Sequence, residues 1–182
     1  MNAAIPITDG IHYVGANDRE TDLFEGLWPL PRGVSYNAYV VDDARPALID
    51  TVKGSRFEAW LGKVREILAG RAPDYVVVNH MEPDHSGSLC QLREIFPGVA
   101  IVGNTKTAEF LERFYGIREN VRVVADGDLL DLGQHKLSFH FMPMVHWPES
   151  MATYESTQKV LFSNDAFGGF GALEGGIFDD EV

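Results

Sequence analysis

Residues 80–85, with the sequence HMEPDH, come one residue after the apolar stretch YVVV at residues 75–78. The apolar stretch is rich in β-branched residues and predicts a buried strand. Four of the six residues 80–85 carry imidazole or carboxylate groups, so a dense set of metal donors stands at a strand end, where layered α/β proteins tend to place their sites. The set contains no thiolate, which favours iron over a structural zinc.

The spacing within this run divides the donors into two pairs. In an extended chain residues i and i+2 point to the same side, so His80 and Glu82 can hold one metal together. Pro83 favours this geometry because the residue before a proline is pushed into extended conformations, and the fixed φ of proline turns the chain. Asp84 and His85 follow the turn and diverge from the first pair, so they are placed to hold a second metal nearby.

Two later residues also stand just past predicted strands. His146 follows the strand that ends near Met144, and Asp165 follows residues 161–164. A carboxylate at Asp165 could bridge two metals about 3.5–4 Å apart, a spacing typical of two-metal sites; a turn role after Asn164 is the alternative. The predicted metal ligands are therefore His80, Glu82, Asp84, His85, His146 and Asp165.

The rest of the chain predicts strands first and then an alternation of helices and strands. A helix should begin at Ser55, which forms a capping box with Glu58, and end at Gly70. A later helix should end at Gly116. Strands are predicted at residues 10–14, 35–41, 46–50, 75–78, 99–102, 121–124, 137–142, 151–154 and 160–162, with helices also near 89–96 and 107–114. This order predicts one α/β domain over residues 1–182.

Composition limits the partners. The 182 residues have a formal net charge of -12, from 27 acidic and 15 basic residues, which argues against nucleic acid or an anionic membrane as a partner. No apolar stretch reaches the length of a membrane span, and the first residues do not form a secretory signal. The single cysteine, Cys90, cannot form an internal disulfide. We therefore expect a cytoplasmic protein.

Three segments resemble the diiron domain of the flavodiiron proteins (A-type flavoproteins), a branch of the metallo-β-lactamase fold. They are HMEPDHSGSL at residues 80–89, HWPESMATY at 146–154 and LFSNDAFGGFGALEGGIFDDEV at 161–182. The resemblance implies a metallo-β-lactamase-like αββα sandwich, of which this chain would hold the N-terminal part. Hydrolytic members of the fold carry H-x-H-x-D-H, so Glu82 replaces a histidine here and favours iron over zinc.

The resemblance also implies a distribution of the ligands over two irons. It puts His80, Glu82 and His146 on one iron, Asp84 and His85 on the other, and Asp165 between them. In the family the second iron takes a further histidine beyond the position of Asp165. The chain has no histidine after His146, so we expect the second site to be incomplete.

The function that the resemblance implies is the reduction of dioxygen to water, of nitric oxide to nitrous oxide, or of both. The family carries FMN on a flavodoxin-like domain, which these 182 residues do not include, so we expect a separate flavoprotein or rubredoxin-like electron donor and a homo-oligomer. Two alternatives stay open. A binuclear metallohydrolase of the same fold would bind zinc and carry histidine at position 82, and an inactive metal-binding remnant would aggregate or dimerise.

Other residues with suitable side chains are expected to have structural roles. Trp147 and Phe167 could line a pocket for the diatomic molecule, but we favour a place in the core. Glu149 is assigned to a solvated loop rather than to a contact with a ligand N–H. The remaining histidines, which have no carboxylate at ligand spacing, are expected to be structural or exposed; they are His12, His135 and His140.

Overall fold

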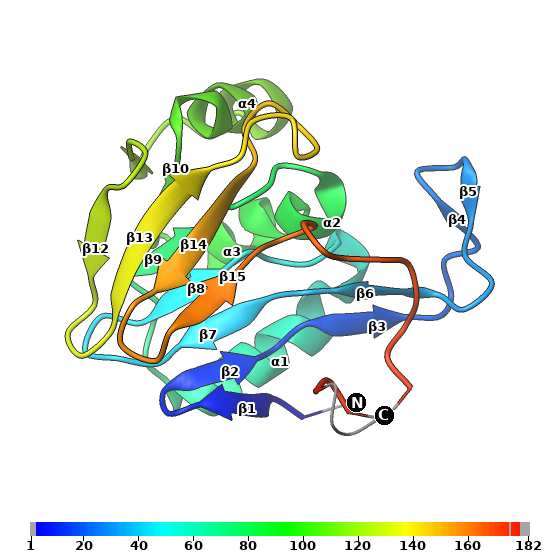
Figure 1. Cartoon of the computed structure of the whole chain (residues 1–182), viewed down its shortest axis with the longest axis horizontal. Coiled ribbons are helices and arrows are strands. Elements are labelled where there is room, and N and C mark those ends of the chain that lie inside the picture. Colours follow the sequence, from blue (N-terminus) through cyan, green and yellow to red (C-terminus); the bar gives the residue numbers. More distant parts are fainter. Residues whose placement is uncertain (1–2, 175, 179–182) are drawn as a thin grey trace.

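The structure is a computed structural model, and it describes residues 3–174 and 176–178. Two large β-sheets pack face to face, and helices cover the other face of the larger sheet (Figure 1). This is the α/β layering that the sequence predicts. Within the described residues no helix covers the outer face of the smaller sheet, so three of the four layers of an αββα sandwich are present.

The larger sheet is mixed and has seven strands, in the order β1 (Ile5–Thr8), β2 (Ile11–Tyr13), β7 (Tyr39–Val41), β8 (Ala47–Ile49), β9 (Tyr75–Val77), β10 (Ala100–Gly103) and β11 (Val121–Val123). The smaller, antiparallel sheet consists of β12 (Leu129–Asp131), β13 (Lys136–Phe141), β14 (Met151–Glu155) and β15 (Val160–Phe162). Two short pairs are β3 (Ala16–Asp18) with β6 (Val34–Tyr36) and β4 (Leu23–Phe24) with β5 (Trp28–Pro29). The helices are α1 (Phe57–Leu68), α2 (Pro83–Ser86), α3 (Leu89–Ile95) and α4 (Thr105–Tyr115).

Strand direction brings the predicted donors to one edge. Strands β8, β9, β10 and β11 run parallel, so the segments that follow β8 and β9 emerge at the same edge. In the smaller sheet, antiparallel pairing puts the start of β14 and the end of β15 together, with Thr153 opposite Phe162. The N–H of Met151 donates to the carbonyl of Asn79 at 3.0 Å, which joins this end of the smaller sheet to the end of β9.

Two apolar clusters hold the layers together. One lies between the larger sheet and the helices, where α1 buries Phe57, Trp60, Leu61, Val64 and Leu68, each at most 3% exposed. The other lies between the two sheets and combines side chains of β8 and β9 with Leu137, Phe139, Met151 and Phe162. Since β8 and β9 are covered on both faces, their sequences are continuous apolar runs rather than alternating ones.

The start of α1 differs from the sequence prediction. A 3₁₀ turn (Gly54–Arg56) precedes α1. Arg56 is the N-cap residue of α1, and it makes no side-chain capping hydrogen bond. The predicted capping box of Ser55 and Glu58 is therefore wrong. Arg56 instead donates to the buried carboxylate of Asp18 at 2.7 Å. A buried carboxylate needs this partner, and the tertiary ion pair outweighs the local capping preference.

The segment predicted as one strand at residues 35–41 is broken at Asn37 and Ala38. Its first half, β6, pairs with β3, whereas its second half, β7, joins the larger sheet between β2 and β8. The β4–β5 hairpin was not predicted, because each of its strands has only two residues. It extends to one side of the sandwich (Figure 1).

Helix α4 agrees with its predicted boundary. Asn104 caps its N-terminus by accepting the N–H of Thr107 at 3.0 Å, and Gly116 ends it in the left-handed conformation, at φ 67°. Glycine adopts that conformation without the steric cost of a Cβ atom. No helix in the described part of the chain is both long enough and apolar enough to cross a membrane.

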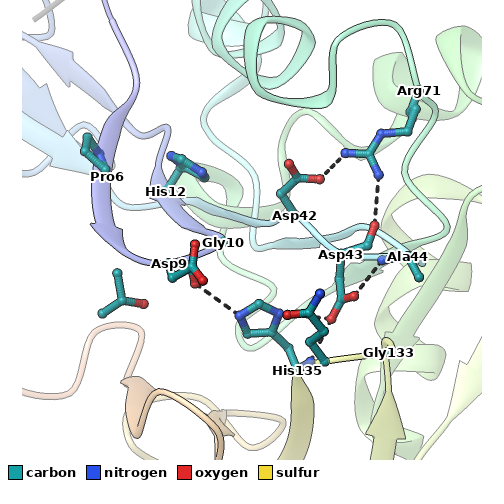
Figure 2. Close-up of a pocket in the computed structure, with 12 residues that line it drawn as sticks. Pro6, Asp9, Gly10, His12, Asp42, Asp43, Ala44, Arg71, Gly133 and His135 are labelled. Carbon is teal, nitrogen blue, oxygen red and sulfur yellow. Dashed lines mark hydrogen bonds and ion pairs between the residues drawn. The ribbon is translucent and has the colours of Figure 1, made fainter.

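A polar clasp joins the two sheets at the end where β8 and β9 begin, which is opposite to residues 80–85. Figure 2 shows its residues. The ring of His135, in the β12–β13 turn, contacts the carboxylate of Asp43 at 2.9 Å and the carbonyl of Asp9 at 3.2 Å. Arg71 donates to the carbonyl of Asp43 at 2.9 Å. These residues line a hollow of about 850 Å³, and their mutual contacts give it a structural role. Gly10 permits the close approach, since a Cβ there would lie 2.6 Å from the His135 ring.

Loss of the clasp carboxylate should destabilise the fold. Each Asp43 oxygen accepts a backbone N–H, from Ala44 at 2.6 Å and from His135 at 2.7 Å. Asp43→Asn replaces one acceptor by a donor, so the free energy of unfolding should fall by about 1–3 kcal/mol at neutral pH, measured by denaturant titration. Asp74→Asn, at an exposed position, is the control and should change little.

The loss of stability caused by Asp43→Asn should depend on pH. Burial alone would raise the pKa of Asp43, but the backbone N–H groups of His135 and Ala44 lower it to about 2. The unfolded chain has a pKa of about 3.9, so the carboxylate stabilises the fold fully above that value and loses this effect as the pH falls through about 2. The difference between the wild type and Asp43→Asn should therefore shrink in acid; a constant difference would contradict this role.

Candidate metal centre

The predicted ligand loop leaves β9 in an extended conformation and then turns. Glu82 has φ -59° and ψ 143°, and Pro83 is the first residue of α2, as the conformational limits of proline favour. Asp84 and His85 therefore lie within a single helical turn. The hydroxyl of Ser86 donates to the carbonyl of Met81 at 2.7 Å and closes the loop on itself.

Four of the six predicted residues converge on one point. The Nε2 atoms of His80 and His146 lie 3.3 Å apart, and Glu82 Oε2 is 3.1 Å from the first and 2.9 Å from the second. Asp165 Oδ2 is 3.5 Å from His80 Nε2 and 3.4 Å from His146 Nε2. One donor atom from each of these residues falls within 4.8 Å of all the others, a geometry that could hold a metal ion.

The other two predicted residues lie on the opposite side of Asp165. His85 Nε2 is 2.8 Å from Asp165 Oδ1 and 3.4 Å from Asp84 Oδ2. The two oxygens of Asp165 thus face different partners, Oδ1 toward His85 and Oδ2 toward His80 and His146. This is the arrangement that a bridging carboxylate requires. The structure therefore brings all six predicted residues together in two adjoining groups.

The acidic surroundings favour positive charge on the imidazoles. Burial alone would lower the pKa of His80, but contacts with Glu149 and Glu82 raise it to about 10. Burial alone would also lower the pKa of His85, but the contact with Asp165 and the charge of Asp84 raise it to about 9. Groups that raise the pKa of a histidine in this way also favour a bound cation.

The donor set fits metal ions. The ring nitrogens of His80 and His146 both point at the same oxygen of Glu82, so their lone pairs can be directed to a common centre. Asp84 Oδ1 is buried and has no hydrogen-bond partner in the described part of the chain, which leaves an acceptor available on the second side. Oxygen and imidazole donors without thiolate suit iron.

Asp50 and Asn164 support His85, and sequence analysis did not identify them. Asn164 donates to Asp50 Oδ2 at 3.1 Å, and its side-chain nitrogen lies 3.4 Å from His85 Nδ1. Asp50 also accepts the N–H of Asn79 at 2.7 Å, next to the ligand loop. Asn164 has φ 54°, a left-handed conformation that asparagine tolerates, and it sets the direction of the following residue, Asp165. These contacts join segments that are far apart in the sequence.

Glu149 corrects the prediction of a solvated loop carboxylate. It is fully buried, and its Oε1 lies 2.7 Å from His80 Nδ1 and accepts the N–H of Met81 at 2.8 Å. The carbonyl of Glu149 accepts from the side chain of Asn104 at 2.7 Å, which ties it to the N-terminus of α4. A carboxylate behind the second ring nitrogen holds a histidine in the tautomer that presents Nε2 forward. Only its proximity to His146 in the sequence could have indicated this role.

The remaining expectations have mixed outcomes. Trp147 is partly buried and packs edge-on against His80, with ring centroids 5.3 Å apart. Phe167, predicted to be core, is 95% exposed, so that prediction is wrong. His140 is exposed, as predicted, and His135 is the buried member of the clasp described above.

The comparisons with known proteins identify the family of this chain. The family model described as "ODP family beta lactamase" matches residues 34–180. A nitric oxide reductase of Moorella thermoacetica is 38% identical over all of this chain and 46% of its own length. An anaerobic nitric oxide reductase flavorubredoxin of an Enterobacter species is 38% identical over 98% of this chain and 38% of its own length.

Solved structures give the same result. Rubredoxin:oxygen oxidoreductase of Desulfovibrio gigas has a TM-score of 0.92 and 35% identity over 98% of this chain and 45% of its own. The flavodiiron protein of Giardia intestinalis has a TM-score of 0.88 and 35% identity over 94% of this chain and 42% of its own. This chain thus spans less than half of the length of each of these proteins. It belongs to the ODP beta-lactamase family, among the flavodiiron proteins whose motifs it carries.

Proposed function

We propose that residues 1–182 act as the diiron domain of an oxidoreductase that reduces dioxygen to water, nitric oxide to nitrous oxide, or both. The observation that carries this proposal is the position of Asp165, whose two oxygens face His80 and His146 on one side and His85 on the other. The matched relatives include proteins named nitric oxide reductase and rubredoxin:oxygen oxidoreductase, which supports the same reaction class.

These contacts support the proposed ligands. His80, Glu82 and His146 would hold one iron, Asp84 and His85 the other, and Asp165 would bridge them. Glu82 is the residue that favours iron over the zinc of a metallohydrolase, because a carboxylate adds negative charge and hardness where an imidazole would be softer. Two adjacent irons would supply electrons and open coordination positions to diatomic molecules.

The residues of the chain would hold and shield the metals. Glu149 and Asn164 would orient the histidines, and Trp147 would exclude water from one side of His80.

Coupling two nitric oxide molecules takes two electrons, and reducing dioxygen to water takes four, so turnover requires an external donor. We propose a flavin or rubredoxin-type donor, and exposed apolar side chains beside the ligands support such docking: Phe167 is 95% exposed and Met144 68%. A homo-oligomer and a cytoplasmic location complete the proposal.

Single-turnover chemistry tests the reaction. Protein loaded anaerobically with ferrous iron and mixed with nitric oxide should release about one nitrous oxide for each pair of irons, and then stop, because a metal pair of this kind has two electrons to give. A reduced rubredoxin-type donor should restart the production. Gas chromatography of the headspace measures both. Sustained production with no donor present would refute the need for one, and no nitrous oxide or oxygen uptake at all would refute the function.

Metal analysis tests the site. Protein purified without oxygen should bind about two irons per chain, the second more weakly than the first because residues 1–182 supply no further histidine for it. Asp165→Ala should reduce this toward one, since the bridging oxygens are lost, while Asp9→Asn at the far end of the sheets should leave it unchanged. Elemental analysis gives the content and Mössbauer spectroscopy the coupling. Preferential zinc binding would favour the hydrolase, and unaltered iron content in Asp165→Ala would contradict the bridge.

Glu149 should control the affinity for iron. Glu149→Gln keeps the size of the side chain but removes the charge behind His80 Nδ1, so the dissociation constant should rise by about 10–100-fold. Competition with a chelator measures this value. Glu58→Gln, on the exposed first turn of α1, is the matched control. Equal affinities in Glu149→Gln and the wild type would show that the contact with His80 is dispensable.

A further inference from the structure

Residues 166–173 form a glycine-rich segment, which we call the strap. It begins directly after Asp165, past the end of β15, and runs to the β3–β6 pair (Figure 1). Its middle has little support from the described part of the chain. Phe167 is 95% exposed, and a Cβ at Gly169 would meet no atom within 4 Å. The proposed function uses only the ligand before the strap and the exposed ring of Phe167.

Two side chains of the paired strands fix the far end of the strap. Asn17 of β3 and Ser35 of β6 lie opposite each other, with Oδ1 and Oγ 2.9 Å apart. Asn17 Oδ1 accepts the N–H of Leu173 at 3.0 Å, and Ser35 Oγ lies 2.9 Å from the carbonyl oxygen of Gly171. The position of the strap therefore depends on residues 156 and 136 positions earlier in the sequence.

Further contacts dock the same end. The N–H of Ala172 donates to the carbonyl of Arg32 at 2.8 Å, and Ala172 is only 7% exposed. The ring of Phe170 packs against that of Phe24 in the β4–β5 hairpin, with centroids 5.0 Å apart. The far end of the strap is thus held by polar and apolar contacts, whereas its middle is not.

The near end of the strap joins the carboxylate that would bridge the two irons. The side chain of Asp165 is 34% exposed, against 12% for Asp84 and 4% for Glu82, so packing holds it least. Asn164 and Phe167, on either side of it, have φ 54° and 71°. A bulky residue at positive φ is strained and keeps that conformation only when its surroundings impose it. The direction of Asp165 therefore depends on how the strap is anchored.

We propose that Asn17 and Ser35 are positioning residues of the metal centre: by docking the far end of the strap, they hold the backbone that directs the two oxygens of Asp165 to opposite sides. This inference rests on the proposed function, because it concerns the metals that Asp165 would bridge. The coupling is reciprocal, since a ligand that prefers one state of a segment also populates that state. Metal binding should therefore tighten residues 170–173, although none of them is a proposed ligand.

Substitutions at the anchor and in the middle of the strap should act in opposite directions. Asn17→Ala removes the acceptor of the Leu173 N–H, and Asn17→Asp keeps an acceptor oxygen there. Gly169→Ala should favour the docked strap, because Gly169 does not have a positive φ, has space for a Cβ, and alanine restricts the undocked chain. Glu119→Gln, at an exposed position, is the control.

Co(II) is the probe, because its visible band reports ligand geometry and the same titration gives its affinity. Hydrogen exchange with mass spectrometry reports the docking of residues 170–173, which Co(II) should slow in the wild type. Asn17→Ala should exchange faster there, bind Co(II) about fivefold more weakly and show a shifted band. Asn17→Asp and the control should match the wild type, and Gly169→Ala should bind about twofold more tightly.

Two results would overturn the positioning role while the proposed function stands. One is exchange in residues 170–173 that Co(II) leaves unchanged, and the other is faster exchange in Asn17→Ala with unaltered affinity and band. Ser35→Ala keeps the test decisive if Asn17→Ala does not fold, because it removes only the contact with Gly171 and should change the same quantities in the same direction. If the wild type binds neither Co(II) nor iron, the metal centre and this inference both fail.

Discussion

Contacts between buried imidazoles and carboxylates are the interaction on which the candidate metal centre depends. His80 and His85 are almost completely buried, a position that a polar ring occupies only with partners on its nitrogens. Glu149 and Glu82 supply those partners for His80, and Asp165 with Asn164 supplies them for His85. The fold provides these partners because parallel strands of one sheet and antiparallel strands of the other end at the same edge.

Contacts between a histidine and a carboxylate have different roles at the two ends of the sandwich. At the clasp, both ring nitrogens of His135 face oxygen atoms of the protein, Asp43 on one side and the Asp9 carbonyl on the other, so the ring ties three turns together. At the metal centre, Nδ1 of His80 is held by Glu149, while Nε2 faces Glu82, His146 and Asp165 together. The donor atoms gathered around Nε2 of His80 can therefore bind one metal ion together with it. Each ring nitrogen of His135 has a single partner, so this ring has a structural role.

Local sequence was a good guide where local forces dominate. The strand before residues 80–85, the helix ending at Gly116 and the turn at Pro83 depend on apolar runs, glycine and proline, whose conformational preferences act within a few residues. It failed where a distant residue intervened. Arg56 turns to Asp18 instead of allowing a capping box at Ser55, and the predicted strand at 35–41 divides because its halves pair with different partners.

The sequence by itself determined the donor residues and their spacing, because the extended geometry before Pro83 and the turn after it are local properties. It also carried the motifs by which the family can be recognised. Only the tertiary structure decided which carboxylates surround which histidines. Glu149 and Asp165 lie 69 and 80 residues from the histidines they contact, His80 and His85, and no local rule connects such positions. Their roles arise from chain segments that meet only once the sheets have packed.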